Sequence, residues 1–136
     1  MSYINVTITH TYAGGFVPPR STTLEAGFSR EGGRLEHLER IAGVDGAPVK
    51  VTEYDPSTVP AEAARGLLDA TLGAGGVRQV QVEHGDGAQP SLVTWSDSFG
   101  TKLGSAFDVA LPAPVQSILD AAALVQRAID AAPIAR

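Results

Sequence analysis

The sequence predicts an α+β fold, an antiparallel sheet from two hairpins with helices packed on one face. Residues 3–12 and 77–84 alternate apolar and polar side chains, which is typical of half-buried strands. Each is followed by a glycine-containing turn and a second β-prone segment. A stretch with helical periodicity then follows each hairpin. This order favours one antiparallel sheet that is covered by helices on one face, within a single domain spanning residues 1–136.

The first predicted hairpin begins at the N-terminus. Its first strand places apolar side chains on one face and polar side chains on the other: Ile4, Val6 and Ile8 against Asn5, Thr7 and Thr9. His10 belongs to the apolar face and is expected at the margin of the sheet. The sequence "AGG" then predicts a turn, and "FVPPRSTTLEA" resumes extended character. Pro18 and Pro19 cannot donate to a β-ladder, so their part of the second strand must be an edge or a loop.

The middle of the chain predicts a helix, a strand and a second helix. Leu35, Leu38 and Ile41 recur at roughly helical spacing, which predicts a short helix over residues 29–43. Residues 48–55 are a possible strand. A stronger helix signal follows in residues 55–76, with Pro60 suited to its first turn and Gly73 to its end. The apolar face expected for this helix consists of Ala64, Leu67, Leu68 and Leu72.

The last third of the chain predicts a hairpin, a connector and a long helix. Residues 77–84 and 90–97 form the hairpin around the turn "GDG", with Trp95 in or near the core. Residues 98–111 are expected to be a connector, anchored by Phe99, Leu103, Phe107 and Val109. The final helix starts near Pro112 or Pro114. Its continuous apolar stripe comprises Val115, Ile118, Leu119, Ala122, Val125 and Ile129.

Composition excludes several classes of function. The net charge is −5 and the basic residues are scattered, which argues against a protein that binds nucleic acid through its phosphates. No apolar run approaches the length of a membrane span, and the N-terminus has no targeting pattern, so we expect no membrane association and a cytoplasmic location. The abundance of Ala, Gly and Val suggests a GC-rich bacterial genome. The chain has no cysteine, which excludes disulfides and thiolate chemistry.

The sequence shows no set of catalytic or metal-binding residues. His10, His37 and His84 do not occur at metal-ligand spacing within one element, so we expect no metal and no cofactor. The glycines of "GAGG" follow a helix and precede a strand, which is the reverse of a dinucleotide-binding motif. There is no G-x-S-x-G motif, and "WSDS" at residues 95–98 has no histidine nearby in the sequence. These observations favour a protein that is not an enzyme and has no catalytic residues.

Several short motifs follow one another along the chain: Gly14-Gly15-Phe16 with Arg20, then "VPAEAARGLLDATL", "VRQVQVEHGDGAQPSLVTWSD" and "LPAPVQSILDAAALV". The order of these motifs resembles the emfourin family. Emfourins are small intracellular bacterial proteins that inhibit thermolysin-like zinc metalloproteases such as protealysin. The resemblance covers about two thirds of the chain. It departs from the family at residues 26–58 and at "SFGTKLGSAFDVA", and either segment could alter the inhibitory surface.

The resemblance implies a protease-binding site at Gly14, Gly15, Phe16, Val17 and Arg20. Glycines allow the backbone to approach the walls of a cleft, and Phe16 offers a large apolar side chain. Pro18 and Pro19 would reduce the entropy lost on binding, and Arg20 could pair with acidic groups. Two alternatives stay open. Phe16 could fold back onto the core with the glycines as turn residues, or the protein could be a non-catalytic interaction or assembly module with no protease target.

Overall fold

Seven strands form one sheet in a computed structural model, which describes residues 3–14, 17–29, 33–44, 49–85 and 89–131. The strands are β1 (Tyr3–Gly14), β2 (Val17–Ser29), β3 (Leu35–Val44), β4 (Lys50–Glu53), β5 (Gln79–His84), β6 (Leu92–Ser96) and β7 (Lys102–Phe107). Their order across the sheet is β4-β3-β2-β1-β5-β6-β7. Each half of the chain therefore builds one side of the sheet, and β1 and β5 join the two halves at the centre.

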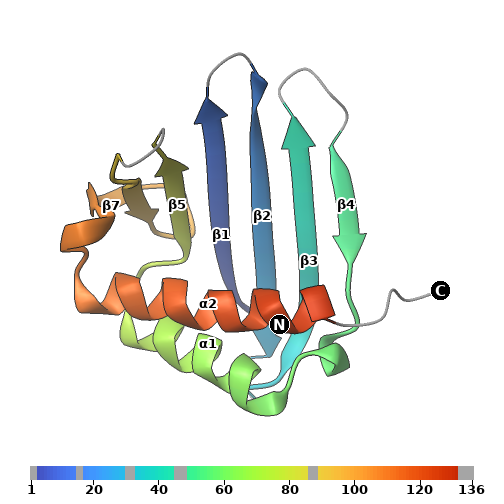
Figure 1. Ribbon diagram of the computed structural model, residues 1–136. Coiled ribbons are helices and arrows are strands. Elements are labelled where there is room, and N and C mark those ends of the chain that lie inside the picture. The colour runs from blue at the N-terminus through green and yellow to red at the C-terminus, as the bar shows by residue number, and fades with distance from the viewer. Residues whose placement is uncertain (1–2, 15–16, 30–32, 45–48, 86–88, 132–136) are drawn as a thin grey trace.

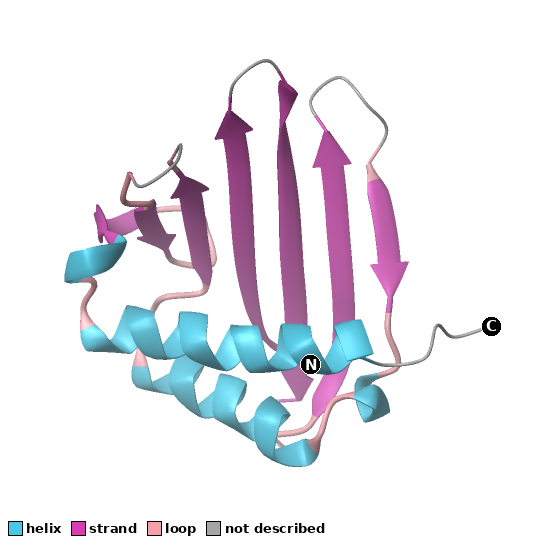
Figure 2. Ribbon diagram, in the orientation of Figure 1, coloured by secondary structure: helices cyan, strands magenta, loops and turns pink. Residues whose placement is uncertain are grey.

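Two helices lie side by side on one face of this sheet, as Figures 1 and 2 show. They are α1 (Ala61–Gly73) and α2 (Ala113–Ala131), and short 3-10 turns precede them at η1 (Pro56–Thr58) and η2 (Asp108–Ala110). Both helices cross the half of the sheet in which β1 begins and β2 ends (Figure 1). The other half of the long strands projects beyond the helices, and no helix of the described residues covers the opposite face of the sheet.

The core lies between the covered half of the sheet and the two helices. Strand alternation sends every second side chain of β1, β2 and β5 into it, while the helices contribute their apolar stripes. The largest fully enclosed side chains among the described residues are Val6, Ile8, Phe28, Leu38, Leu67, Thr71, Val80, Val93, Ile118 and Val125. Thr71 satisfies its hydroxyl in this apolar setting by donating a hydrogen bond to the carbonyl oxygen of Leu67 at 2.7 Å.

The predicted α+β class, the two hairpins and the helices on one face are confirmed, with one difference in the sheet. Neighbouring strands are antiparallel except β1 and β5, which pair in parallel from Thr7 opposite Gln79 to Tyr12 opposite His84. The sheet is therefore mixed. A parallel pair requires a long crossover, and here β2, β3, β4 and α1 supply it. Sequence periodicity predicts strands but not which distant strands become neighbours.

The helix predicted over residues 29–43 is wrong, because this region contains the strand β3. A β-bulge explains the misleading spacing. Gly27 of β2 pairs with His37, but the next residue, Phe28, pairs with Leu35, so Glu36 is an extra residue in β3. The bulge places both Leu35 and Leu38 on the buried face although they are three residues apart. This i, i+3 pattern imitates one turn of an amphipathic helix.

The connector predicted over residues 98–111 is also wrong in part, because it contains the edge strand β7. Its expected anchors do not enter the core. Phe99 is 91% exposed and Val109 is 84% exposed, while Leu103 and Phe107 are about half exposed. In α1, the buried position expected for Leu72 is occupied by Thr71, and Leu72 is 51% exposed. The stripe of α2 is confirmed, with Ala121 as an additional buried member.

The backbone of strand β7 lies against the ring of Trp95, so the position of Gly104 has no room for a side chain. Trp95 and Gly104 are direct partners across β6 and β7. A Cβ atom at Gly104 would lie 2.6–2.9 Å from three atoms of the Trp95 indole. We expect Gly104→Ala to lower the free energy of unfolding by about 1–3 kcal/mol through overpacking. Chemical denaturation measures this, with Gly76→Ala as the control because nothing lies within 4 Å of that position. Equal stability of the two variants would contradict the expectation.

Candidate functional site

The β1–β2 hairpin extends beyond both strands that flank it. The ladder between β2 and β3 ends where Arg20 pairs with Val44. On the other side, the ladder between β1 and β5 ends where Tyr12 pairs with His84. Residues 13–14 of β1 and 17–19 of β2 therefore continue past the ends of these two ladders as a narrow hairpin end (Figure 1). Of the residues that the emfourin resemblance implies, Gly14 and Val17 lie in this hairpin end and Arg20 lies at its base.

The two prolines lie at an irregularity of this hairpin. Tyr12 pairs with Arg20 and Gly14 pairs with Val17, so β2 has one residue more than β1 between these two pairs. Pro18 and Pro19 lie within this bulge and past the end of β3, where no ladder hydrogen bond to a third strand is required. Of the other implied site residues, Gly14 ends β1 and Val17 begins β2. Gly15 and Phe16 lie outside the described residues.

A stack of side chains fixes the base of the hairpin end. The guanidinium carbon of Arg20 lies 5.8 Å from the centre of the Tyr12 ring, within the range of a cation–π contact. The Tyr12 ring in turn stacks on the His84 ring, with centroids 4.3 Å apart and planes 5° from parallel. These three side chains come from three adjacent strands, because Tyr12 is the direct partner of both Arg20 and His84. Arg20 remains exposed.

The stack continues into a hydrogen-bonded pair of histidines. Nδ1 of His10 and Nε2 of His84 are 2.8 Å apart, so one ring donates an N–H to the other. Nδ1 of His84 also lies 3.4 Å from the hydroxyl oxygen of Ser91. Burial, together with the neighbouring His84, lowers the pKa of His10 below its usual value of 6.5. The lowered pKa favours the neutral form of His10 at neutral pH, and the hydrogen bond joins its ring to the His84 ring that stacks on Tyr12.

The lowered pKa of His10 predicts a loss of stability in acid. Between its folded pKa and 6.5, the unfolded chain binds more protons at His10 than the folded chain does. His10 therefore lowers the free energy of unfolding as the pH falls through this range. Above pH 6.5 it has little effect on the free energy of unfolding. We expect the thermal midpoint to fall between about pH 7.5 and about pH 5, and to fall less in His10→Asn. Parallel pH profiles of the two proteins would contradict this assignment.

His10 and His84 are neighbours in the structure although they are far apart in the sequence. His10 and His84 are separated by 74 positions. Each ends the run of core-facing residues on its own strand, after Ile8 in β1 and after Val82 in β5. That common position was visible in the sequence. It brings the two rings together only because β1 and β5 are neighbours in parallel, which the sequence did not indicate.

Two hollows near the hairpin could accept parts of a partner. One, of about 340 Å³, lies between the sheet and α2 below Tyr12 and reaches Arg127, which is exposed. The other, of about 380 Å³, lies beside Arg20 and ends at Val44 and Lys50. A larger hollow of about 940 Å³ lies near η1 and the start of α1, at the opposite end of the long strands. It is remote from the hairpin, and the charged residues that line it are Arg34, Asp55, Glu62 and Arg65.

The residues weighed in the sequence for catalysis have local structural roles. One carboxylate oxygen of Asp97 accepts hydrogen bonds from the backbone N–H groups of Phe99 and Thr101, both at 2.9 Å. It therefore organises the turn between β6 and β7. The segment "GAGG" ends α1 and leads to β5, as expected, and Gly75 adopts a φ of 65° there.

Comparison with known proteins identifies no relative of this chain. A scan against protein-family models, a search of curated proteins and a search of solved structures each found no match. Among the described residues, neither helix has both the length and the apolar character needed to cross a membrane. The assignment of function therefore depends on the geometry of the hairpin and on the motifs in the sequence.

Proposed function

We propose that this protein is an inhibitor of a thermolysin-like, protealysin-type zinc metalloprotease, and that it blocks the active-site cleft without covalent chemistry. The observation that carries the proposal is the projecting end of the β1–β2 hairpin, to which Gly14 and Val17 belong and at whose base Arg20 lies. The emfourin resemblance supplies the class of target. A cytoplasmic location in a bacterium belongs to the same proposal.

The shape of the hairpin end suits a cleft. It is two strands wide where it leaves the sheet, and the Tyr12–His84 stack and the Arg20 contact hold its base in one orientation. A segment that is already ordered loses less conformational entropy on binding than a flexible loop does. Pro18 and Pro19 add to this because their φ angles are fixed. Gly14 permits close approach of the backbone to the walls of the cleft.

The surface beside the hairpin supports a protein partner at this end of the sheet. Val44 is 42% exposed at the end of β3, and Val49 and Val51 are 62% and 55% exposed at the start of β4. Lys50 lies between the latter two valines and borders the hollow next to Arg20. Exposed valines next to the cations Arg20 and Lys50 form a surface that would fit a partner whose contact surface is apolar at its centre and acidic at its rim.

Titration of a thermolysin-like protease with the purified protein tests the proposal. Hydrolysis of a peptide substrate should fall to a stoichiometric end point. Phe16→Ala should weaken inhibition by about 1–3 kcal/mol and Arg20→Ala by about 1 kcal/mol, as expected when anchor residues are truncated. Arg34→Ala is the matched control, because this arginine has an 80% exposed side chain and directly precedes β3, whose other end pairs with Arg20. Neither Phe16→Ala nor Arg20→Ala should unfold the protein.

Two results would overturn the proposal. Absence of inhibition across thermolysin-like proteases would remove the class of target. Unfolding of Phe16→Ala, with normal inhibition by the fraction that remains folded, would show that Phe16 belongs to the core and is not the anchor. Unchanged inhibition by Arg20→Ala alone would exclude Arg20 from the contact but leave the hairpin as its centre.

A second candidate function is assembly through the other edge of the sheet. Strand β7 is an edge strand, and Leu103, Phe107 and Val109 are exposed along it and just after it. Exposed apolar groups on an unpaired edge favour strand addition. Under this alternative, the protein would form concentration-dependent oligomers that Phe107→Lys disrupts, and it would inhibit no protease. Sedimentation analysis of both proteins distinguishes the two functions.

A further inference from the structure

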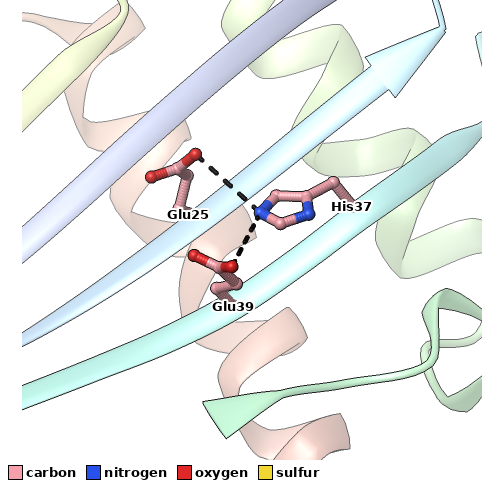
Figure 3. A group of neighbouring side chains, drawn as sticks. All are labelled: Glu25, His37 and Glu39. Atoms are coloured by element: carbon pink, nitrogen blue, oxygen red, sulfur yellow. Dashed lines mark ion pairs between the residues drawn. The ribbon is translucent and has the colours of Figure 1, made fainter. Parts of the chain in front are cut away.

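Three side chains that commonly bind metal ions converge on the face of the sheet that carries no helix (Figure 3). Glu25 belongs to β2, and His37 and Glu39 belong to β3. Nε2 of His37 lies 3.5 Å from a carboxylate oxygen of Glu39 and 3.9 Å from one of Glu25. One donor atom from each of the three residues lies within 4.8 Å of the other two.

The register of the sheet creates this convergence. Glu25 and Glu39 are direct partners across β2 and β3, while His37 is two residues before Glu39 on the same face of β3. The direct partner of His37 is Gly27, which has no side chain to fill the space between His37 and Glu25. The imidazole can therefore lean along the ladder towards both carboxylates, as Figure 3 shows.

The same register concentrates negative charge in one row. Glu39 is also the direct partner of Glu53 on β4, so three glutamates stand side by side across three strands. Like charges directly opposite each other destabilise a sheet. In the described part of the chain, His37 forms the ion pairs of Glu25 and Glu39, and no lysine or arginine forms one with either residue. A divalent cation held between Glu25 and Glu39 would compensate the negative charge of this row.

We propose that Glu25, His37 and Glu39 bind one Zn²⁺ ion. Zinc accepts a mixture of imidazole nitrogen and carboxylate oxygen, whereas calcium and magnesium favour oxygen ligands alone. Tetrahedral ligands at 2.0–2.1 Å from zinc are about 3.3 Å apart. The two separations from His37, 3.5 and 3.9 Å, and the third, within 4.8 Å, would shorten as the side chains close around an ion. The three side chains are 24–35% exposed to solvent, so an ion can reach them from solution.

The site would have three protein ligands and one open position. That position would take a water molecule or a donor atom from another molecule, as in zinc sites that are not purely structural. The ion would add to the stability of the fold but would not be required for it, because the apolar core lies on the other face of the sheet. The inference is independent of the proposed protease inhibition, since the hairpin end contributes no ligand.

Calorimetric titration of the full chain with zinc chloride, after removal of metals by a chelator, tests the site. We expect one ion per chain and a rise in the thermal midpoint on addition of zinc. His37→Gln, Glu39→Gln and Glu25→Gln should each weaken binding by at least about tenfold and reduce the thermal shift. Glu36→Gln is the matched control, because it removes a carboxylate from the same strand without removing a ligand.

A second arm separates this site from the His10–His84 pair, which could also bind metal ions. His84→Gln should leave zinc binding unchanged. The proposal is overturned if the wild-type protein takes up no zinc, if His37→Gln binds zinc as the wild type does, or if His84→Gln abolishes binding. Circular dichroism of each metal-free variant verifies that it is folded. Loss of affinity in all three folded ligand variants, but not in Glu36→Gln, supports the site.

Discussion

We expect Phe28→Ala to lower the free energy of unfolding by about 3–5 kcal/mol. Phe28 has no exposed surface and lies in the core beneath the helices, next to the bulge where β2 meets the start of β3. Its removal would cost the transfer free energy of the ring and leave a cavity that the surrounding strands can fill only in part. Because domains of this size are stable by about 5–15 kcal/mol, the variant would keep only part of its stability.

Urea denaturation followed by circular dichroism measures this effect, with Phe99→Ala as the matched control. Phe99 has the same side chain but is 91% exposed in the turn before β7. Its replacement should change the free energy of unfolding by less than about 0.5 kcal/mol. A change below about 1 kcal/mol for Phe28→Ala would show that the bulged end of β3 does not enclose the ring as described.

The elements with clean periodicity could be predicted from the sequence. The alternation of Ile4, Val6 and Ile8 and the stripe from Val115 to Ile129 both depend on local order, and both are confirmed. Strand β7 was not predicted, because its residues that face the covered side of the sheet are small. Gly104 and Ala106 face the covered side, so the large apolar side chains of this strand point away from the core and reverse the usual pattern.

The bulge in β3 shows why a short periodic segment is ambiguous. Leu35 and Leu38 are buried three residues apart in a strand, and no local signal distinguishes this from a helix. The preceding residues did contain a useful pattern, since Leu24, Ala26 and Phe28 alternate with more polar or smaller neighbours. Extending the second strand to Ser29 would have left little room for a helix to begin before Leu35.

This one error also concealed a candidate site. In a helix over residues 29–43, His37 and Glu39 would not point the same way, because positions two apart lie on nearly opposite sides of a helix. In a strand they share a face. The partner Glu25 is then fixed by the register of the β2–β3 ladder. The histidine pair beneath the hairpin was hidden for a related reason, since the parallel contact of β1 and β5 is a property of the whole sheet.

We expect Ile118→Ala to lower the free energy of unfolding by about 2–5 kcal/mol. Ile118 is fully buried in the apolar stripe of α2, where the helix packs on the sheet and beside α1. The matched control is Leu124→Ala on the same helix, because Leu124 is 52% exposed. That variant should lose less than about 1 kcal/mol, since alanine has the higher helix propensity and little buried surface is lost.

The comparison of these two α2 variants tests the placement of this helix on the sheet. Both replace a branched aliphatic side chain in the interior of α2 by alanine, and the helix propensities of Ile and Leu differ by only a few tenths of a kcal/mol, so burial is the main difference between the two sites. A difference of about 2 kcal/mol or more in the expected direction requires the Ile118 face to lie on the sheet. Equal effects, or a larger loss in Leu124→Ala, would mean that α2 is rotated about its axis. The hollow below Tyr12, which α2 borders, would then have a different lining.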